Sequence, residues 1–122
     1  MSTQQELVEQ YMDGFRRSDH PAILACLTDD VVWRIHGART ARGKREFDAE
    51  IGDPGFEGSP DLSVERMIID GNSTVITGTG HGQHRTIGPI HFNYCDVFTF
   101  RDGLVAYTPI GRERVSTSAP DG

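Results

Sequence analysis

Asp96 is the residue whose position bears most directly on chemistry. It lies in the segment Phe92-Asn93-Tyr94-Cys95-Asp96-Val97-Phe98-Thr99-Phe100, where a strand would turn alternate side chains to opposite faces. Alternation places its carboxyl on the same face as four aromatic rings. Removing a lone charge from water is costly, so the group must acquire a proton, hydrogen-bond donors or a cation. The pattern predicts an acid lining a ligand pocket, a buried ion pair with Arg85 or Arg112, or a carboxylate at a subunit interface.

Tyr11 and His36 are two further candidates for proton chemistry. Tyr11 falls on the apolar stripe of a predicted helix, where its hydroxyl either donates to a substrate oxygen or reaches the rim of the core. His36 ends a predicted strand, where it is either a base beside a pocket or an exposed loop histidine. We expect the pocket to be lined by apolar residues on the same faces: Phe15, Trp33, Ile35, Phe47, Tyr94 and Phe98.

The remaining histidines and glycines carry weaker signals. His81 and His84 are three residues apart in a predicted strand, so they point to opposite faces and cannot ligate one ion together. We predict neither a metal nor a cofactor, since no P-loop or dinucleotide fingerprint occurs either. Gly78, Gly80 and Gly82 recur at period two, which either leaves room for a ligand or allows the strand to bend.

The first half of the chain is predicted to be mainly helical. Thr3 and Glu6 have the spacing of a capping box, which marks the start of an amphipathic helix. Asp19 can cap a second short helix with Pro21 in its first turn, and Ile23, Leu24 and Leu27 facing inward. Residues 31–35 are β-branched and aromatic and predict a strand. A third helix is predicted over 44–51, followed by a loop over 52–60.

The second half is predicted to form strands. Their ranges are 62–69, 73–85, 90–100 and 104–110, separated by turn signals such as Asp102-Gly103. Helices gathered first and antiparallel strands gathered last predict an α+β fold, with three helices on one face of a curved sheet. Such a sheet can leave a conical apolar cavity. We expect a single domain over 1–122, with 116–122 as a flexible tail.

Composition excludes several classes of function. The chain has 122 residues and a formal net charge of −6, which argues against binding to a nucleic-acid backbone. No apolar run approaches the ~18–20 residues that span a membrane, and the polar start is unlike an export signal. Cys26 and Cys95 are interpreted as small buried thiols. We therefore expect a cytoplasmic protein.

Three segments together resemble a known family. They are Thr28-Asp29-Asp30-Val31-Val32-Trp33, the helix start Gly43-Lys44-Arg45-Glu46-Phe47, and the strand pair Phe98-Thr99-Phe100-Arg101-Asp102-Gly103-Leu104-Val105. In this order they resemble the SnoaL-like branch of the nuclear-transport-factor-2-like (NTF2-like) superfamily, over residues 4–114. The resemblance implies a conical α+β barrel. It also implies a homodimer through the outer sheet face, where we expect Thr77, Thr79, His91 and Asn93.

Within that superfamily, ketosteroid isomerases offer the closest match of site residues. The resemblance implies that Tyr11 takes the place of their oxyanion-binding tyrosine and Asp96 that of their protonated aspartic acid. Their general base falls where this sequence has Ile35. Limonene-type epoxide hydrolases need an arginine where Tyr94 stands, and both they and the polyketide cyclases need an acid in the last strand. Residues 104–110 contain none, so both activities are disfavoured.

Two functions remain from this reasoning. The leading one is proton transfer next to a carbonyl of a small apolar cyclic substrate, with Tyr11 and Asp96 as donors to the developing oxyanion and His36 as the base. The alternative is a non-catalytic ligand-binding or dimerisation module of the same fold.

Overall fold

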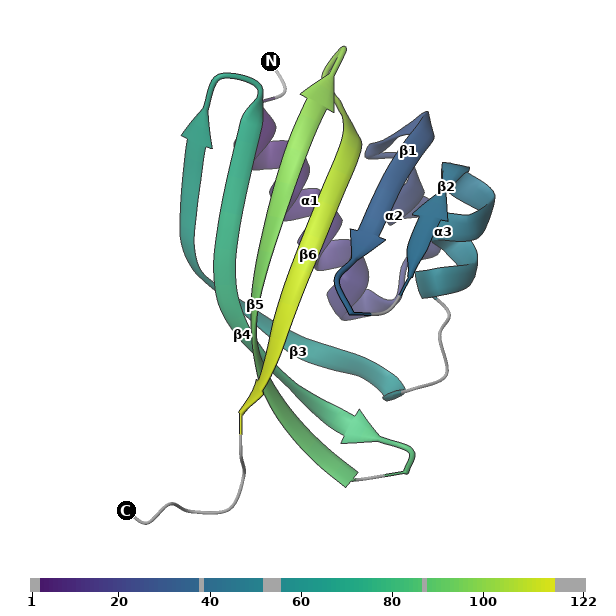
Figure 1. Cartoon of the computed structure of the whole chain (residues 1–122), viewed down its shortest axis with the longest axis vertical. Helices are drawn as coiled ribbons and strands as arrows, with labels where there is room; N and C mark the ends of the chain where they lie inside the picture. The colour runs from purple at the N-terminus through teal and green to yellow at the C-terminus, as the bar shows by residue number, and fades with distance from the viewer. Residues whose placement is uncertain (1–2, 38, 52–55, 87, 116–122) are drawn as a thin grey trace.

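The computed structural model describes residues 3–37, 39–51, 56–86 and 88–115. They form three helices and one six-stranded sheet (Figure 1). In chain order the elements are α1 (Gln4–Arg17), α2 (His20–Leu24), β1 (Leu27–Ile35), β2 (Thr40–Arg42), α3 (Gly43–Ile51), β3 (Phe56–Asp70), β4 (Ser73–His84), β5 (Gly88–Arg101) and β6 (Leu104–Val115).

Helix α1 begins and ends at recognisable local signals. The Thr3 hydroxyl accepts from the backbone N–H of Glu6 at 3.1 Å, and the Glu6 carboxylate accepts from the backbone N–H of Thr3 at 2.9 Å. This is the predicted capping box. The helix ends at Ser18, which adopts a left-handed conformation with φ of 52°. Its buried stripe includes Tyr11 and Met12 and faces the sheet.

The sheet has the strand order β2-β1-β6-β5-β4-β3, and only β1 and β6 run parallel among the described strands. It curves around α1, which crosses its inner face, while α2 and α3 cover the end near β1 and β2 (Figure 1). The predicted α+β fold, with three helices on one face of a curved and mostly antiparallel sheet, is thus confirmed.

Several strands are longer than predicted. β1 starts at Leu27 rather than at residue 31, so Leu27 belongs to the sheet and not to the second helix. β3 starts at Phe56, inside the segment expected to be loop, of which residues 52–55 lie outside the described part. The glycine and proline of this segment favour a loop. β4 nevertheless extends to His84 and pairs with Phe56, and this pairing holds the segment as a strand.

Short and late strands also escaped the pattern. β2, three residues long, lies between the predicted strand 31–35 and the predicted helix 44–51, where no strand was expected, and is held by antiparallel pairing with β1. β6 continues past residue 110 to Val115 because β5 continues alongside it. The expected tail, 116–122, lies outside the described residues.

The two cysteines occupy opposite environments. Cys26 is fully buried, as expected, and its thiol donates to the carbonyl oxygens of Ala22 and Leu7 at 3.4 and 3.7 Å. Cys95 is exposed, and the prediction of a buried thiol is wrong for it. The reason is strand alternation: Cys95 precedes the inward-facing Asp96 and therefore points to the outer face of the sheet.

Candidate functional site

The inner face of the sheet surrounds Asp96 with apolar side chains. Asp96 is 5% exposed and pairs across the strands with Ile76 on β4 and Ile110 on β6. The same row continues to Met67 on β3 and to Ile35 on β1. The carboxyl therefore occupies the middle of a row of aliphatic residues that spans five strands.

Tyr11 enters this face from the helix above it. Its buried ring packs edge-on against Phe98, with centroids 5.1 Å apart, and against Phe47 at 6.3 Å. Phe98 follows Asp96 by two residues on the same side of β5, so α1 and β5 bring Tyr11 and Asp96 to one region of the inner face.

The expected pocket-lining rings form one packed cluster. Phe15 contacts Tyr11 and Trp33, with centroids at 5.0 and 5.9 Å, and Trp33 stacks on Phe47 at 4.3 Å. Phe15 and Ile35 are half-buried, whereas the other rings of the cluster are buried. The side chains of Tyr11, Phe15, Trp33, Phe47 and Phe98 therefore pack against one another in the region where the pocket was expected.

Tyr94 is held in place by the neighbouring strands. Its hydroxyl donates to the carbonyl oxygen of Ser63 on β3 at 2.9 Å, reaching over Gly78 of β4. Burial raises the pKa of Tyr94 to about 12; an ionised Asp96 would add to the rise, and Arg16 opposes it. The phenol therefore stays protonated at neutral pH and acts as a donor.

The repeated glycines make room for side chains of the protein itself. A Cβ on Gly78 would lie 2.7 Å from the Tyr94 hydroxyl and would overlap the carbonyl oxygen of Ser63. A Cβ on Gly80 would overlap the ring of Phe92, its partner in the ladder. The space interpreted as room for a ligand at these two positions is thus occupied by Tyr94 and Phe92.

His36 lies apart from the aromatic cluster. It is exposed just beyond β1, where its backbone N–H donates to the carbonyl of Ile110 at 3.1 Å. The structure therefore brings Tyr11, Asp96 and the aromatic residues together and leaves His36 at the edge. Of the arginines considered as partners of Asp96, Arg85 is exposed, and the side chain of Arg112 lies outside the described part.

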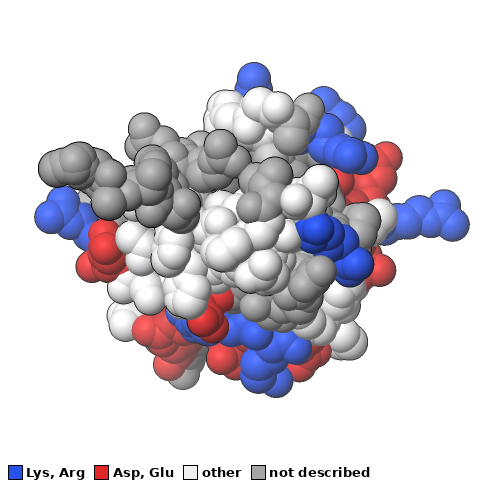
Figure 2. Space-filling model, turned by 90° about the horizontal axis from the view of Figure 1, so that it is seen from below, with Lys and Arg blue, Asp and Glu red and all other residues white. Residues whose placement is uncertain are grey.

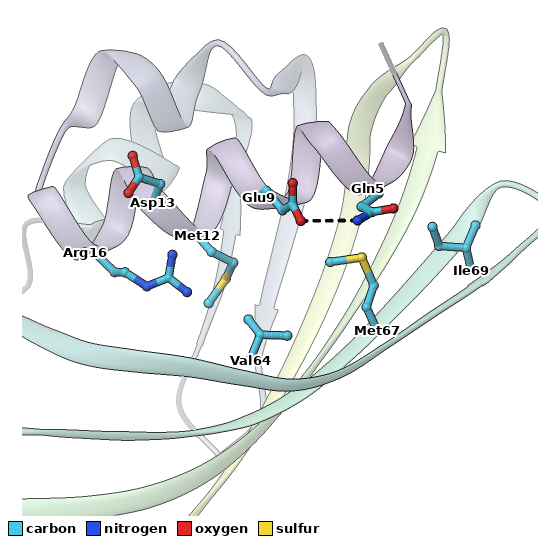
Figure 3. A pocket seen from close by; sticks show the side chains of 8 residues that line it. All are labelled: Gln5, Glu9, Met12, Asp13, Arg16, Val64, Met67 and Ile69. Atoms are coloured by element: carbon cyan, nitrogen blue, oxygen red, sulfur yellow. Dashed lines mark hydrogen bonds between the residues drawn. The ribbon is translucent and has the colours of Figure 1, made fainter. Parts of the chain in front are cut away.

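A cavity that the sequence did not indicate lies between α1 and β3 (Figure 3). This α1–β3 groove has a volume of about 650 Å³. The residues that line it are Gln5, Glu9, Met12, Asp13, Arg16, Val64, Met67 and Ile69. Two signals could have found it: the i, i+4, i+8 spacing of Gln5, Glu9 and Asp13, and a shift in alternation between Val64 and Met67, where the pairing with β4 is irregular.

Other kinds of site find little support in the described residues. No three His, Cys, Asp or Glu side chains gather there as a metal ligand set requires. His81 stacks on His91 across β4 and β5, with centroids 5.4 Å apart. None of the described helices is long and apolar enough to cross a membrane. Seen from below, acidic and basic side chains alternate around the rim of the described surface (Figure 2).

Comparison with known proteins identifies relatives of the fold. The family model described as a SnoaL-like domain matches residues 8–108. No curated protein matches the sequence closely enough to count as a relative.

Solved structures share the whole architecture. An NTF2-like protein from Burkholderia pseudomallei K96243 is 24% identical, with 90% of each chain covered and a TM-score of 0.82. A ketosteroid isomerase-like protein from Catenulispora acidiphila, in complex with trimethylamine, is 13% identical, with 88% and 85% covered and a TM-score of 0.79. An epoxide hydrolase of Mycobacterium tuberculosis that resembles limonene epoxide hydrolase is 20% identical, with 88% and 80% covered and a TM-score of 0.75.

Proposed function

This chain belongs to the family of SnoaL-like domains, and from that premise we propose that it binds a small apolar carbonyl compound on its inner sheet face and moves a proton next to the carbonyl. The observation that carries the proposal is the position of Asp96, buried between Ile76 and Ile110. Aliphatic surroundings disfavour a charged carboxylate, so Asp96 acts as a neutral acid that donates a hydrogen bond.

Tyr11 supplies the second donor. Its ring packs against Phe98, which lies on the same face of β5 as Asp96. Two donors held in a water-excluded site stabilise the negative charge that develops on a carbonyl oxygen during enolisation, and one such donor is worth about 3 kcal/mol. The pair thus favours the transition state over the bound ketone.

The substrate class follows from the cluster around the donors. Phe15, Trp33, Phe47 and Phe98 offer aromatic surfaces without a charge, which suits an apolar ring. Because these side chains pack against one another, a ligand must displace some of them. Phe15 and Ile35 are the half-buried members, and they are the ones we expect to move.

His36 is the proposed base. It follows Ile35, which lies two strands from Asp96 in the same row. Two strand spacings, about 9.6 Å, separate Ile35 from Asp96, and His36 reaches a bound ligand when its side chain turns inward past the end of β1. A neutral imidazole there would accept the proton next to the carbonyl.

A second candidate is binding without catalysis. It is favoured by the exposure of His36 and by Ile35, an apolar residue where ketosteroid isomerases carry their base. In this alternative Tyr11 and Asp96 hold a ligand oxygen and no proton is transferred.

Binding of a phenolic ligand tests the donor pair. We expect 2-naphthol, which resembles an enolate, to bind the wild type, and Tyr11→Phe and Asp96→Ala each to weaken binding about tenfold, because a donor is lost from a desolvated site. Asp96→Asn should lose less, since an amide still donates. Fluorescence titration provides the affinities. Tyr107→Phe, on the outer face, is the control for loss of a phenol. Equal affinities for all variants would contradict the proposal.

Proton exchange separates the two candidates. In deuterated water, NMR should show loss of the α-protons of a cyclic ketone at a rate that depends on His36 as the base. His36→Ala should abolish most of the exchange and leave naphthol binding unchanged. A wild type that binds naphthol but exchanges no proton would support the binding module.

A further inference from the structure

The α1–β3 groove is separate from the residues of the proposed site. None of its lining side chains belongs to the aromatic cluster, and the buried Met12 forms part of its wall on α1 (Figure 3). A volume of about 650 Å³ falls in the range typical of small-molecule sites. Between Gln5 and Arg16 the helix rises by about 16 Å, so the groove suits an elongated ligand.

One wall of the groove is apolar and exposed. Val64 and Ile69 on β3 are 36% and 47% exposed, and they are two of the four large hydrophobic residues exposed in the described part of the chain. Met67 lies between them and is half-buried (Figure 3). Exposed apolar side chains that gather beside polar ones mark a binding surface.

The other wall carries an acidic group without a counter-ion. Asp13 pairs with Arg17 at 2.8 Å, and the Nε–H of Arg16 donates to the carbonyl of Leu62 at 2.9 Å. Within the described residues Glu9 has no ion-pair partner, and its carboxylate accepts only from the Gln5 amide, at 3.3 Å. A cation that binds Glu9 would therefore displace no other charge.

Gln5 adds a second acceptor. Because its amide nitrogen donates to Glu9, its carbonyl oxygen is left to accept from a ligand. An ammonium group has three N–H donors, and it can satisfy two of them on Glu9 and Gln5 and the third on water. The net charge of −6 also favours the approach of cations over anions.

We propose that the α1–β3 groove binds a linear aliphatic primary amine. The ammonium lies on Glu9 and Gln5, and the hydrocarbon chain lies along Met67 and Val64. An aliphatic carboxylate of equal length would meet two carboxylates, Glu9 and Asp13, against the cation Arg16, whose Nε–H donates to Leu62.

The test compares three ligands of one chain length on the full chain: n-octylamine, 1-octanol and octanoate. Isothermal titration at pH 7 and low salt should give octylamine an affinity at least fivefold higher than either of the others. Glu9→Gln should weaken octylamine about fivefold and leave octanol unchanged, whereas Glu65→Gln, an exposed carboxylate of β3 outside the groove, should have no effect. Val64→Ser should weaken both octylamine and octanol.

Other results would overturn the proposal. These are no binding up to millimolar octylamine, equal binding of amine and alcohol, or preference for octanoate. An affinity for octylamine that becomes weaker as the protein concentration rises would also overturn it, because a second copy of the chain would then occupy the groove. Both Glu9 and Val64 are exposed, so the variants should fold, and thermal melts check this. Since 2-naphthol is placed at Tyr11 and Asp96, two strands away from Met67, it should not compete with octylamine, and failure of one site leaves the other testable.

Discussion

Burial in the interior of this protein favours the neutral form of two side chains, Cys26 and Tyr94. Burial raises the pKa of the Cys26 thiol from 9.0 to about 11, and the thiol donates to the carbonyls of Leu7 and Ala22. Tyr94, whose pKa is also raised, to about 12, donates to Ser63. Both groups are neutral donors in the folded state, so deprotonation of either one opposes folding.

This neutrality predicts a loss of stability in alkali. Between pH 9 and 11 the folded state retains the Cys26 proton that the unfolded state releases, so the free energy of unfolding falls as pH rises. The loss due to Cys26 should reach roughly 2 kcal/mol at pH 10.5. Urea titrations at pH 8 and 10.5 measure it.

Two variants separate this effect from other titrations. Cys26→Ala should remove most of that pH-dependent loss, although Tyr94 will still contribute at the upper end. Cys95→Ala changes an exposed thiol and should leave the pH dependence as in the wild type. An unchanged slope in Cys26→Ala would show that the buried thiol is not responsible.

At the residue scale, strand and helix periods were informative. They placed Asp96 on an inward face and Tyr11 on a buried stripe, because the direction of a side chain within one strand or helix follows from the period of that element alone. They could not foresee that the Tyr94 hydroxyl would bond to Ser63, since that contact depends on the pairing of three strands. The isolation of Glu9 from cations was likewise invisible in the sequence.

At the scale of elements, the glycines of β4 determine how closely the central strands and their side chains approach. Tyr94 and Phe92 of β5 lie over Gly78 and Gly80, their partners in the ladder. At these positions a large ring of β5 covers the backbone of β4, where glycine has no side chain. The packing of the ring compensates for the weak strand preference of glycine.

Gly78→Ala should therefore destabilise the protein by about 3 kcal/mol, since the added methyl overlaps the backbone of Ser63 and must move β3 or the Tyr94 ring. Thermal or urea unfolding gives the value. Gly111→Ala is the matched control, because a Cβ there has no neighbour within 4 Å. Equal effects of the two substitutions would argue against a close contact at Gly78.

Prediction of the elements succeeded where one strand or helix carries its own signal. The capping box, the helix 44–51 and the strand near 90–100 are such cases. It failed at β2 and at the start of β3, where pairing with β1 and β4 overrides a sequence that by itself suggests a loop. The groove was missed for the same reason, since it needs α1 and β3 to meet.

At the scale of the whole molecule, the helices cover one face of the sheet and leave the outer face of the sheet uncovered (Figure 1). Thr77 and Thr79 on β4 and His91 and Asn93 on β5 point to that face, together with the apolar Val75 and Val97. These side chains, in register across two strands, form a surface without Lys, Arg, Asp or Glu that suits a second copy of the chain.

We therefore expect a homodimer, of twice 13.5 kDa, in sedimentation-velocity experiments at micromolar concentration. Thr77→Arg would place charges against each other across the two-fold axis and should yield monomers. Gln10→Arg, an exposed position on α1 away from this face, should remain dimeric. A monomeric wild type would contradict the prediction.

The parallel pairing of β1 with β6 has a consequence for synthesis. Leu27 pairs with Val105, so two neighbouring strands inside the sheet come from opposite ends of the chain. At about 5–20 residues per second, a ribosome needs roughly 4–16 s to extend the chain from one to the other. During that interval one edge of β1 lacks the strand that pairs with it, and this open edge is a target for chaperones or for pairing with another nascent chain.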